Sequence, residues 1–138
     1  MATYQGSCHC GRIAFEVEGE IGPVYDCNCS MCRRRGGLLA AFPRAALTLK
    51  TAEADLSTYR FNREAIAHHF CATCGIAPFS EGTGRDGAAM AMVNVRCLPD
   101  VDLSALRGGC HQWLAPSMAP ATERAVIARG RRQPGRTP

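Results

Sequence analysis

The chain has 138 residues, a length that fits one domain with a core of its own. Its formal net charge of +4 lies wholly in residues 123–138, because residues 1–122 hold 11 Lys and Arg against 11 Asp and Glu. No apolar run approaches the ~20 residues of a membrane helix, and the N-terminus lacks the basic and apolar parts of a secretory signal. We therefore expect a soluble, cytoplasmic protein.

Residues 1–122 are expected to form a single domain, and residues 123–138 a basic, flexible tail. The tail is rich in Arg, Gly and Pro and poor in apolar residues. No aromatic side chain is interleaved with its arginines to stack on bases, so nucleic acid is not expected as a partner. This composition favours a solvated end over a binding surface.

Short strand-like segments separated by Gly and Pro follow one another along the chain. Residues 12–18 alternate apolar and polar side chains, which is typical of a half-buried strand. Further strands are expected at residues 38–42, 47–50, 57–61, 65–70 and 89–95, with turns at 19–23 and 81–87. The one helical segment expected spans 98–108, with Asp100 or Asp102 as its cap and Gly108-Gly109 at its end. The pattern predicts a mainly β fold with short helical turns.

Nine cysteines are the most informative feature of the composition. A reducing cytosol keeps thiols free, so clustered cysteines indicate metal binding or catalysis rather than disulfides. Seven of them are clustered in sequence: Cys8 and Cys10; Cys27, Cys29 and Cys32; Cys71 and Cys74. A structural zinc site takes four thiolates, so the seven divide naturally into four plus three. An iron–sulfur cluster fits this division less well than two separate ions.

Spacing alone allows two ways to make this division. In the first, Cys8, Cys10, Cys71 and Cys74 form the group of four, and Cys27, Cys29 and Cys32 form the group of three. In the second, the two Cys-x-x-Cys pairs, Cys29/Cys32 and Cys71/Cys74, form a zinc ribbon. The first is favoured, because the two pairs are separated by far more than the ~15–20 residues of a compact ribbon.

A group of three sulfurs leaves the fourth position on zinc open to water or substrate, as in catalytic zinc sites. Arg33, Arg34 and Arg35 directly follow this group and can offset its negative charge or bind a substrate carboxylate. Asn94 and Arg96 lie two residues apart on a predicted strand, so they are expected to share a face and to contact substrate. Catalysis is therefore expected at Cys27, Cys29 and Cys32.

Six further residues are weaker candidates. Cys97 is expected to be a buried, inert thiol, and Cys110 with His111 is not expected to close the open site. His68 and His69 are neighbours on a predicted strand, so one is expected to face inward and the other outward. His9, between two ligand cysteines, is expected to point away from the metal.

Four motifs in this order give the chain a resemblance to a known family: "GSCHCGRIAFEV", "CNCSMCRRRGG", "FCATCG" and "VNVRCLPDVD". Together they resemble the glutathione-dependent formaldehyde-activating enzyme family, which also includes centromere protein V. The resemblance covers roughly residues 4–103.

The resemblance implies a β-rich, Mss4-like fold with two zinc ions, one structural and one catalytic, and it implies the first division of the cysteines. It also implies a carbon–sulfur lyase that condenses formaldehyde with glutathione to S-hydroxymethylglutathione. The expected partners are glutathione, or a similar thiol, and a small aldehyde. The alternative interpretation is a non-catalytic zinc scaffold that binds glutathione or a macromolecule.

Overall fold

The computed structural model describes residues 2–27, 29–61 and 65–113. In chain order the strands are β1 Thr3–Ser7, β2 Ala14–Glu18, β3 Val24–Cys27, β4 Leu39–Pro43, β5 Leu47–Leu49, β6 Leu56–Tyr59, β7 Ala67–Cys71, β8 Phe79–Thr83, β9 Ala89–Asn94 and β10 Cys110–Trp113. The helical elements are α1 Cys32–Arg35 and four 3₁₀ turns: η1 Arg44–Ala46, η2 Glu53–Asp55, η3 Val95–Cys97 and η4 Leu103–Gly109. The described chain is therefore mainly β, as the sequence predicts.

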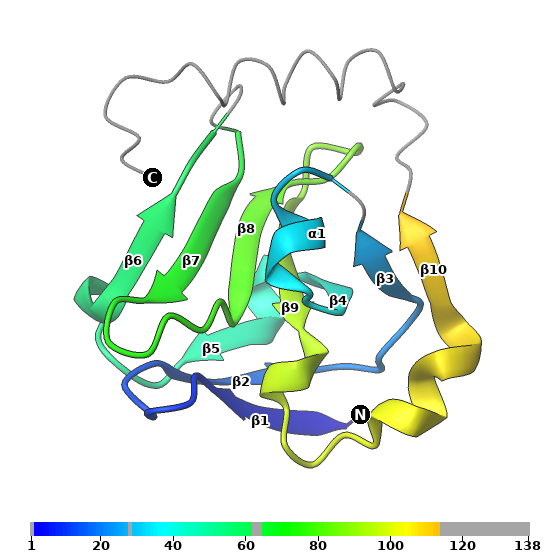
Figure 1. Cartoon of the computed structure of the whole chain (residues 1–138), viewed down its shortest axis with the longest axis horizontal. Helices are drawn as coiled ribbons and strands as arrows, with labels where there is room; N and C mark the ends of the chain where they lie inside the picture. Colours follow the sequence, from blue (N-terminus) through cyan, green and yellow to red (C-terminus); the bar gives the residue numbers. More distant parts are fainter. Residues whose placement is uncertain (1, 28, 62–64, 114–138) are drawn as a thin grey trace.

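The strands form two sheets. The smaller sheet has the order β1-β2-β5 and is antiparallel throughout. The larger sheet has the order β10-β3-β4-β9-β8-β7-β6, and among the described residues its neighbouring strands are antiparallel except β10 with β3. In Figure 1, β1 and β2 run across the bottom of the molecule, and β3, β6, β7, β8 and β10 stand above them. Within the described residues, every helix is too short or too polar to cross a lipid bilayer.

The hydrophobic core lies between the two sheets. Its buried side chains alternate along the strands of both sheets, as the period of two in a half-buried strand requires: Phe15, Val17, Val24, Ala40, Phe42, Leu47, Phe79, Ala91, Val93, Val95 and Leu98. The rings of Phe15 and Phe79 meet across this core, with centroids 5.5 Å apart. Burying each Val, Leu or Phe side chain of this core stabilises the fold by about 1.5–3 kcal/mol.

The seven-stranded sheet also has an outer face, turned away from this core. Residues paired across neighbouring strands lie on the same face of a sheet. One line of such pairs runs across five strands through Ala41, Met92, Ser80, His68 and Tyr59. These five residues define the outer face, since their neighbours in the strands point into the core.

Helix α1 lies on the outer face. Its last residue, Arg35, places its guanidinium 5.8 Å from the ring centroid of Phe70, which is two residues from His68 on β7 and so shares its face. Cys27, which leads into α1, lies three residues after the core residue Val24 and therefore points to the outer face as well. Figure 1 shows α1 in front of β9 and beside β3, consistent with this placement.

Each predicted strand is found, with small shifts of its ends, but two segments differ from the prediction. The expected helix 98–108 is only the 3₁₀ turn Leu103–Gly109, capped by Asp102, whose carboxylate accepts the N–H of Ser104 at 3.0 Å. The expected turn 81–87 begins later, because strand β8 continues to Thr83 and the turn occupies residues 84–87. The predicted basic tail, 123–138, lies outside the described residues.

Candidate functional site

The seven clustered cysteines meet in two separate groups. The sulfur atoms within each group all lie within 4.8 Å of one another. The four-cysteine group is Cys8, Cys10, Cys71 and Cys74, and the three-cysteine group is Cys27, Cys29 and Cys32. This arrangement matches the first of the two divisions that spacing allows, and both groups can hold a metal ion.

The four-cysteine group joins two tight turns from different sheets. Cys8 and Cys10 follow β1, and Cys71 and Cys74 begin at the end of β7. The turns are closed by backbone N–H groups that point at sulfur: the N–H of Ile13 donates to the Cys8 sulfur at 3.3 Å, and that of Cys74 to the Cys71 sulfur at 3.5 Å. These donors favour the thiolate form that metal binding requires.

The distances within the four-cysteine group fit tetrahedral zinc. Four thiolates at the usual Zn–S distance of about 2.3 Å have sulfurs about 3.8 Å apart. The Cys8 and Cys10 sulfurs are 3.7 Å apart, and those of Cys10 and Cys71 are 3.6 Å apart. Cys8 and Cys71 are almost fully buried and Cys10 is exposed. Because four thiolates complete the coordination of a tetrahedral zinc, this group has the character of a closed structural site.

Backbone N–H groups also lower the pKa values of two thiols in the four-cysteine group. The N–H of Ile76 is the largest cause that lowers the pKa of Cys74, to about 6, and the backbone N–H of Cys10 lowers it further. The N–H of Cys74 lowers the pKa of Cys71. The turn at the end of β7 is therefore built to stabilise negative charge on sulfur.

The three-cysteine group forms where β3 passes into α1. Cys27 ends β3 and Cys32 begins α1, while Cys29 receives the backbone N–H of Cys32 on its sulfur at 3.3 Å. Helix α1 is only four residues long because Gly36 adopts a left-handed conformation, with φ of 71°, and closes it by donating to the carbonyl of Cys32 at 2.8 Å. Cys27 is buried, but Cys29 and Cys32 are partly exposed. The group differs from the four-cysteine group in the number of its sulfurs, because three thiolates leave one position of a tetrahedral zinc open.

Contacts among the three sulfurs shift their pKa values in opposite directions. Hydrogen bonds from Cys27 and Cys32 lower the pKa of Cys29 to about 2, and the contact with Cys29 raises the pKa of Cys27 to about 11. Contacts with Cys27 and then Cys29 also raise the pKa of Cys32. These contacts favour negative charge on Cys29 over Cys27 and Cys32.

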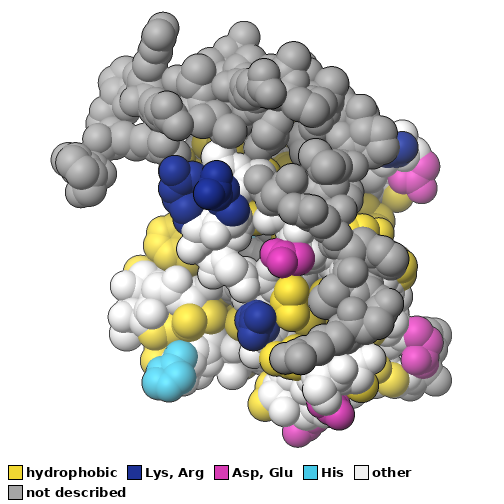
Figure 2. Space-filling view, turned by 45° about the vertical axis from the view of Figure 1, so that its right-hand side comes forward, with side chains coloured by type: hydrophobic (Ala, Val, Ile, Leu, Met, Phe, Trp, Pro, Cys, Tyr) yellow, Lys and Arg dark blue, Asp and Glu magenta, His cyan; other side chains and the backbone are white. Residues whose placement is uncertain are grey.

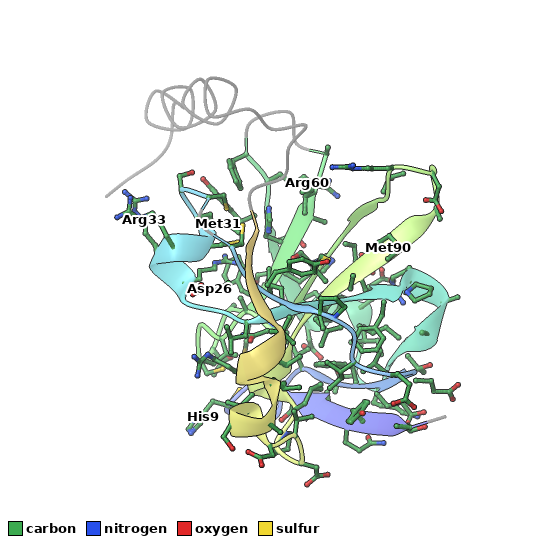
Figure 3. All side chains as sticks on the ribbon, turned by 90° about the vertical axis from the view of Figure 1, so that its right-hand side faces the viewer. His9, Asp26, Met31, Arg33, Arg60 and Met90 are labelled. Carbon is green, nitrogen blue, oxygen red and sulfur yellow. The ribbon has the colours of Figure 1, made fainter. Side chains whose placement is uncertain are left out.

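The three arginines that follow this group point in different directions. The Nη1 atom of Arg34 donates to the carbonyl of Ser30 at 2.5 Å, and Arg35 lies over the ring of Phe70. Arg33 is exposed and points outward from α1, as Figure 3 shows. The face drawn in Figure 2 carries one compact group of Lys and Arg side chains, at the height at which Figures 1 and 3 place α1. Of the three arginines, Arg33 is the most available to bind an anion.

Asn94 and Arg96 do not share a strand face, which corrects the premise of their prediction. Asn94 ends β9, but Arg96 lies in the following 3₁₀ turn Val95–Cys97. The Asn94 oxygen accepts the N–H groups of Leu38 at 3.3 Å and Arg96 at 3.1 Å, and its amide donates to the carbonyl of Ala77 at 3.2 Å. Asn94 thus has a structural role, and a substrate contact by either residue stays a prediction.

The weaker candidates fall in several places. His9 is exposed and points outward in Figure 3, as expected. Cys97 is buried as expected, and burial, followed by the charges of Cys8 and Cys74, raises its pKa to about 11. The backbone of β10 runs beside β3, but the side chains of Cys110 and His111 are outside the described part of the chain.

His68 and His69 are both buried, so the expectation that one of them faces solvent is wrong. They do point to opposite faces of β7, but both faces of the sheet are covered there. The His69 ring lies 5.1 Å from Phe79 on the core side, whereas the His68 ring stacks at 5.4 Å on Phe61.

A chain of polar contacts around His69 is not evident from the sequence. One ring nitrogen meets the hydroxyl of Thr58 at 2.9 Å and the other meets a carboxylate oxygen of Glu81 at 2.9 Å. Glu81 also pairs with Arg44, which donates to the carbonyl of Leu47 at 2.7 Å. Adjacent histidines were the only sequence signal, because these partners come from four separate elements.

Comparison with known proteins decides the family. The sequence model described as "Glutathione-dependent formaldehyde-activating enzyme" matches residues 3–116. The chain belongs to the glutathione-dependent formaldehyde-activating enzyme family. A crystal structure of a Rhodobacter sphaeroides protein is similar to it, with a TM-score of 0.67 and 32% identity; the match covers 77% of this chain and 97% of that one. Membership in the formaldehyde-activating family confirms the resemblance carried by the cysteine motifs, and it supports a lyase-type role with glutathione and formaldehyde as partners.

Proposed function

We propose that this protein is a zinc-dependent carbon–sulfur lyase that adds glutathione to formaldehyde or a related small aldehyde. In the forward direction a C–S bond forms, the π bond of the carbonyl breaks, and the thiol proton ends on the oxygen to give an S-hydroxymethyl adduct. The reverse reaction cleaves the C–S bond and returns the thiol and the aldehyde. The observation that carries the proposal is a group of three cysteine sulfurs, one fewer than a closed zinc site takes, beside an exposed arginine in a chain of this family.

Two zinc ions fit the donors that the chain provides. Cys8, Cys10, Cys71 and Cys74 would hold a structural ion, and Cys27, Cys29 and Cys32 would hold a second ion with one coordination position left for substrate. Bound there, zinc supplies Lewis-acid polarisation and lowers the pKa of a coordinated thiol. The cytoplasm, where thiols stay reduced, suits both groups.

The residues around the three-cysteine group would bind and orient the substrates. Arg33 is placed to take a carboxylate of glutathione, with the charges of Arg34 and Arg35 nearby. Holding a thiol and an aldehyde together makes a bimolecular reaction effectively unimolecular, which is the main gain available for an addition that already proceeds without a catalyst. The end of the family match at residue 116 supports residues 1–122 as one domain.

The decisive experiment measures hemithioacetal formation from glutathione and formaldehyde, with zinc content determined for each sample. We expect the wild-type protein to contain two zinc ions and to exceed the spontaneous rate, and Cys29→Ser to lose one ion and the rate gain. A wild-type rate equal to the spontaneous rate would overturn the lyase proposal. If glutathione still bound under those conditions, the non-catalytic scaffold would be the better account.

A further inference from the structure

The four-cysteine group is assembled from two turns of the same type. The backbone N–H of Cys8 donates to the carbonyl of Ile13 at 3.0 Å, and that of Cys71 donates to the carbonyl of Ile76 at 2.9 Å. In each turn a glycine with a left-handed φ directly follows the second cysteine. Each turn supplies two sulfurs, so a closed zinc site needs both turns to be held against each other.

Arg12, in the first turn, makes a polar bridge to the second turn. Its Nη1 atom donates at 2.8 Å to the hydroxyl oxygen of Thr73, which lies between the two cysteines of the second turn. Its Nε atom donates to a carboxylate oxygen of Asp55 at 3.3 Å. Asp55 directly precedes β6, whose first residue pairs with Cys71. One guanidinium thus contacts both the second turn and the strand beside it.

The two turns are also in contact on the buried side, through the neighbour of Arg12. Ile13 is fully buried and packs with Cys8 and Cys71, whereas 58% of the Arg12 side chain is exposed. An exposed ion pair by itself adds little to the stability of a fold. Its contribution to a metal site is different, because a contact between the two halves of the site raises the effective concentration of one sulfur pair at the other.

We propose that Arg12 is a positioning residue of the four-cysteine group, whose bonds to Thr73 and Asp55 hold the two turns together and slow the loss of zinc. This inference rests on the structural zinc ion of the proposed function, but not on the lyase activity. The ion leaves only after one pair of sulfurs moves away from the other, and that movement must first break the bonds of Arg12. A planar guanidinium suits this role, because it directs donors at two separate acceptors at once.

The test measures the rate at which zinc passes from the protein to an excess of the chelator pyridylazoresorcinol. Its background is the Cys29→Ser protein, which should hold zinc only at the four-cysteine group. We expect Arg12→Met, which keeps the aliphatic stem but removes both bonds, to speed zinc release about threefold to tenfold. Thr73→Val removes one of the two bonds and should give a smaller increase.

Three further proteins separate this bridge from a general loss of stability. Arg12→Met combined with Thr73→Val should release zinc no faster than Arg12→Met alone, because both changes remove the same bond. Arg12→Lys keeps the charge but lacks the fork, so it should recover only part of the loss. Lys50→Met is the matched control, since it breaks an exposed ion pair with Glu16, at 3.2 Å, that involves neither turn.

The inference is overturned if Arg12→Met releases zinc as slowly as the background protein, or no faster than Lys50→Met. It is also overturned if the effects of Arg12→Met and Thr73→Val simply add, or if Arg12→Lys restores the slow release in full, because charge alone would then suffice. A Cys29→Ser protein that holds no zinc, or that still holds two ions, overturns the metal sites of the proposed function, which is a different result.

Discussion

At the scale of single residues, three consecutive arginines have three different surroundings. Arg34 donates a hydrogen bond to the carbonyl of Ser30, and the guanidinium of Arg35 lies over the ring of Phe70. Contacts within the protein therefore explain both positions. Arg33 makes no ion pair with a described residue and is exposed. Sequence reasoning treats the three as equivalent, but a helix directs successive side chains about 100° apart, so only part of the run can face a given ligand.

Arg33→Gln is therefore expected to raise the KM for glutathione about threefold to tenfold, the effect of losing one exposed charge-assisted contact. The KM for 2-mercaptoethanol, which has no carboxylate, should not change. Steady-state kinetics at low and high salt give the measurement, because an exposed ion pair weakens as salt increases. Arg85→Gln, in the exposed turn after β8, is the matched control, and an equal effect there would contradict a specific role for Arg33.

Gly6 shows how closely one residue in β1 approaches the core. A Cβ atom at this position would overlap the ring of Phe15 and lie 2.8 Å from Cδ2 of Leu98, and both side chains are almost fully buried. Gly6→Ala should lower the free energy of unfolding by about 1–3 kcal/mol, because the core must shift to accept a methyl group. Urea unfolding with an unchanged m-value measures this loss.

Gly22→Ala is the control for that experiment, because no atom lies within 4 Å of a Cβ added there. It should leave stability unchanged or raise it slightly, through the lower entropy of the unfolded chain. Equal effects at both positions would show that the β1 contact with Phe15 is not the cause.

At the scale of elements, the network around His69 holds the far end of the large sheet together. It links β6 through Thr58, β7 through His69, β8 through Glu81, and the turn after β4 through Arg44. Burial alone would raise the pKa of Glu81, but hydrogen bonds from His69 and Arg44 outweigh it and lower the pKa. A carboxylate with a lowered folded-state pKa adds stability above its unfolded pKa, about 4.5, and that stability is lost as the pH falls through the folded value.

Glu81→Gln should accordingly destabilise the protein by about 1–2 kcal/mol at pH 7, since it removes the ion pair with Arg44 but keeps a partner for His69. The difference from wild type should shrink as the pH falls below about 4.5, where the wild-type carboxylate also becomes neutral. Unfolding curves of both proteins at each pH measure this, because release of zinc by acid is common to both. Glu20→Gln, at an exposed position, should differ from wild type by less than about 0.5 kcal/mol, and a constant difference at all pH values would contradict the assignment.

How far the sequence predicts the elements depends on what stabilises each one. Strands β2 and β9 alternate clearly because one side packs in the core, and they were predicted. Strand β1, with the sequence TYQGS, has no such alternation; its place is decided by pairing with β2 and by the fit of Gly6 under Phe15. β3 was missed for a similar reason, since its four residues take their conformation from β4 and β10.

The candidate site was predicted better than the elements that carry it. Metal ligands leave a local signal, because they often come in pairs separated by one or two residues. This spacing singles out all seven clustered cysteines, which the structure brings into two groups. Their division into groups needed either the fold or the family resemblance. The stacking of His68 on Phe61 left no comparable signal, because no spacing rule predicts a contact between these two residues.

At the scale of the whole molecule, the two cysteine groups have different structural surroundings. The four-cysteine group joins the end of β1 in the small sheet to the end of β7 in the large sheet, and Ile13 packs with Cys8 and Cys71 beneath it. The three-cysteine group connects residues only five apart in sequence, on one side of the large sheet. An ion at the first site therefore closes a long loop and couples two sheets, whereas an ion at the second closes a short one.

This contrast predicts unequal effects of losing each metal site. Cys71→Ser should reduce zinc content from two ions to one and lower the unfolding temperature by more than about 10 °C, because metal that binds only the folded state contributes directly to its stability. Cys29→Ser should also lose one ion, but its unfolding temperature should fall by only a few degrees, because the core and the four-cysteine group remain intact. Metal analysis and calorimetry on the same samples measure both effects. Cys97→Ala removes a buried thiol that belongs to neither group and should retain two ions. If Cys29→Ser destabilised the protein as much as Cys71→Ser, the separation into one structural and one open site would be wrong.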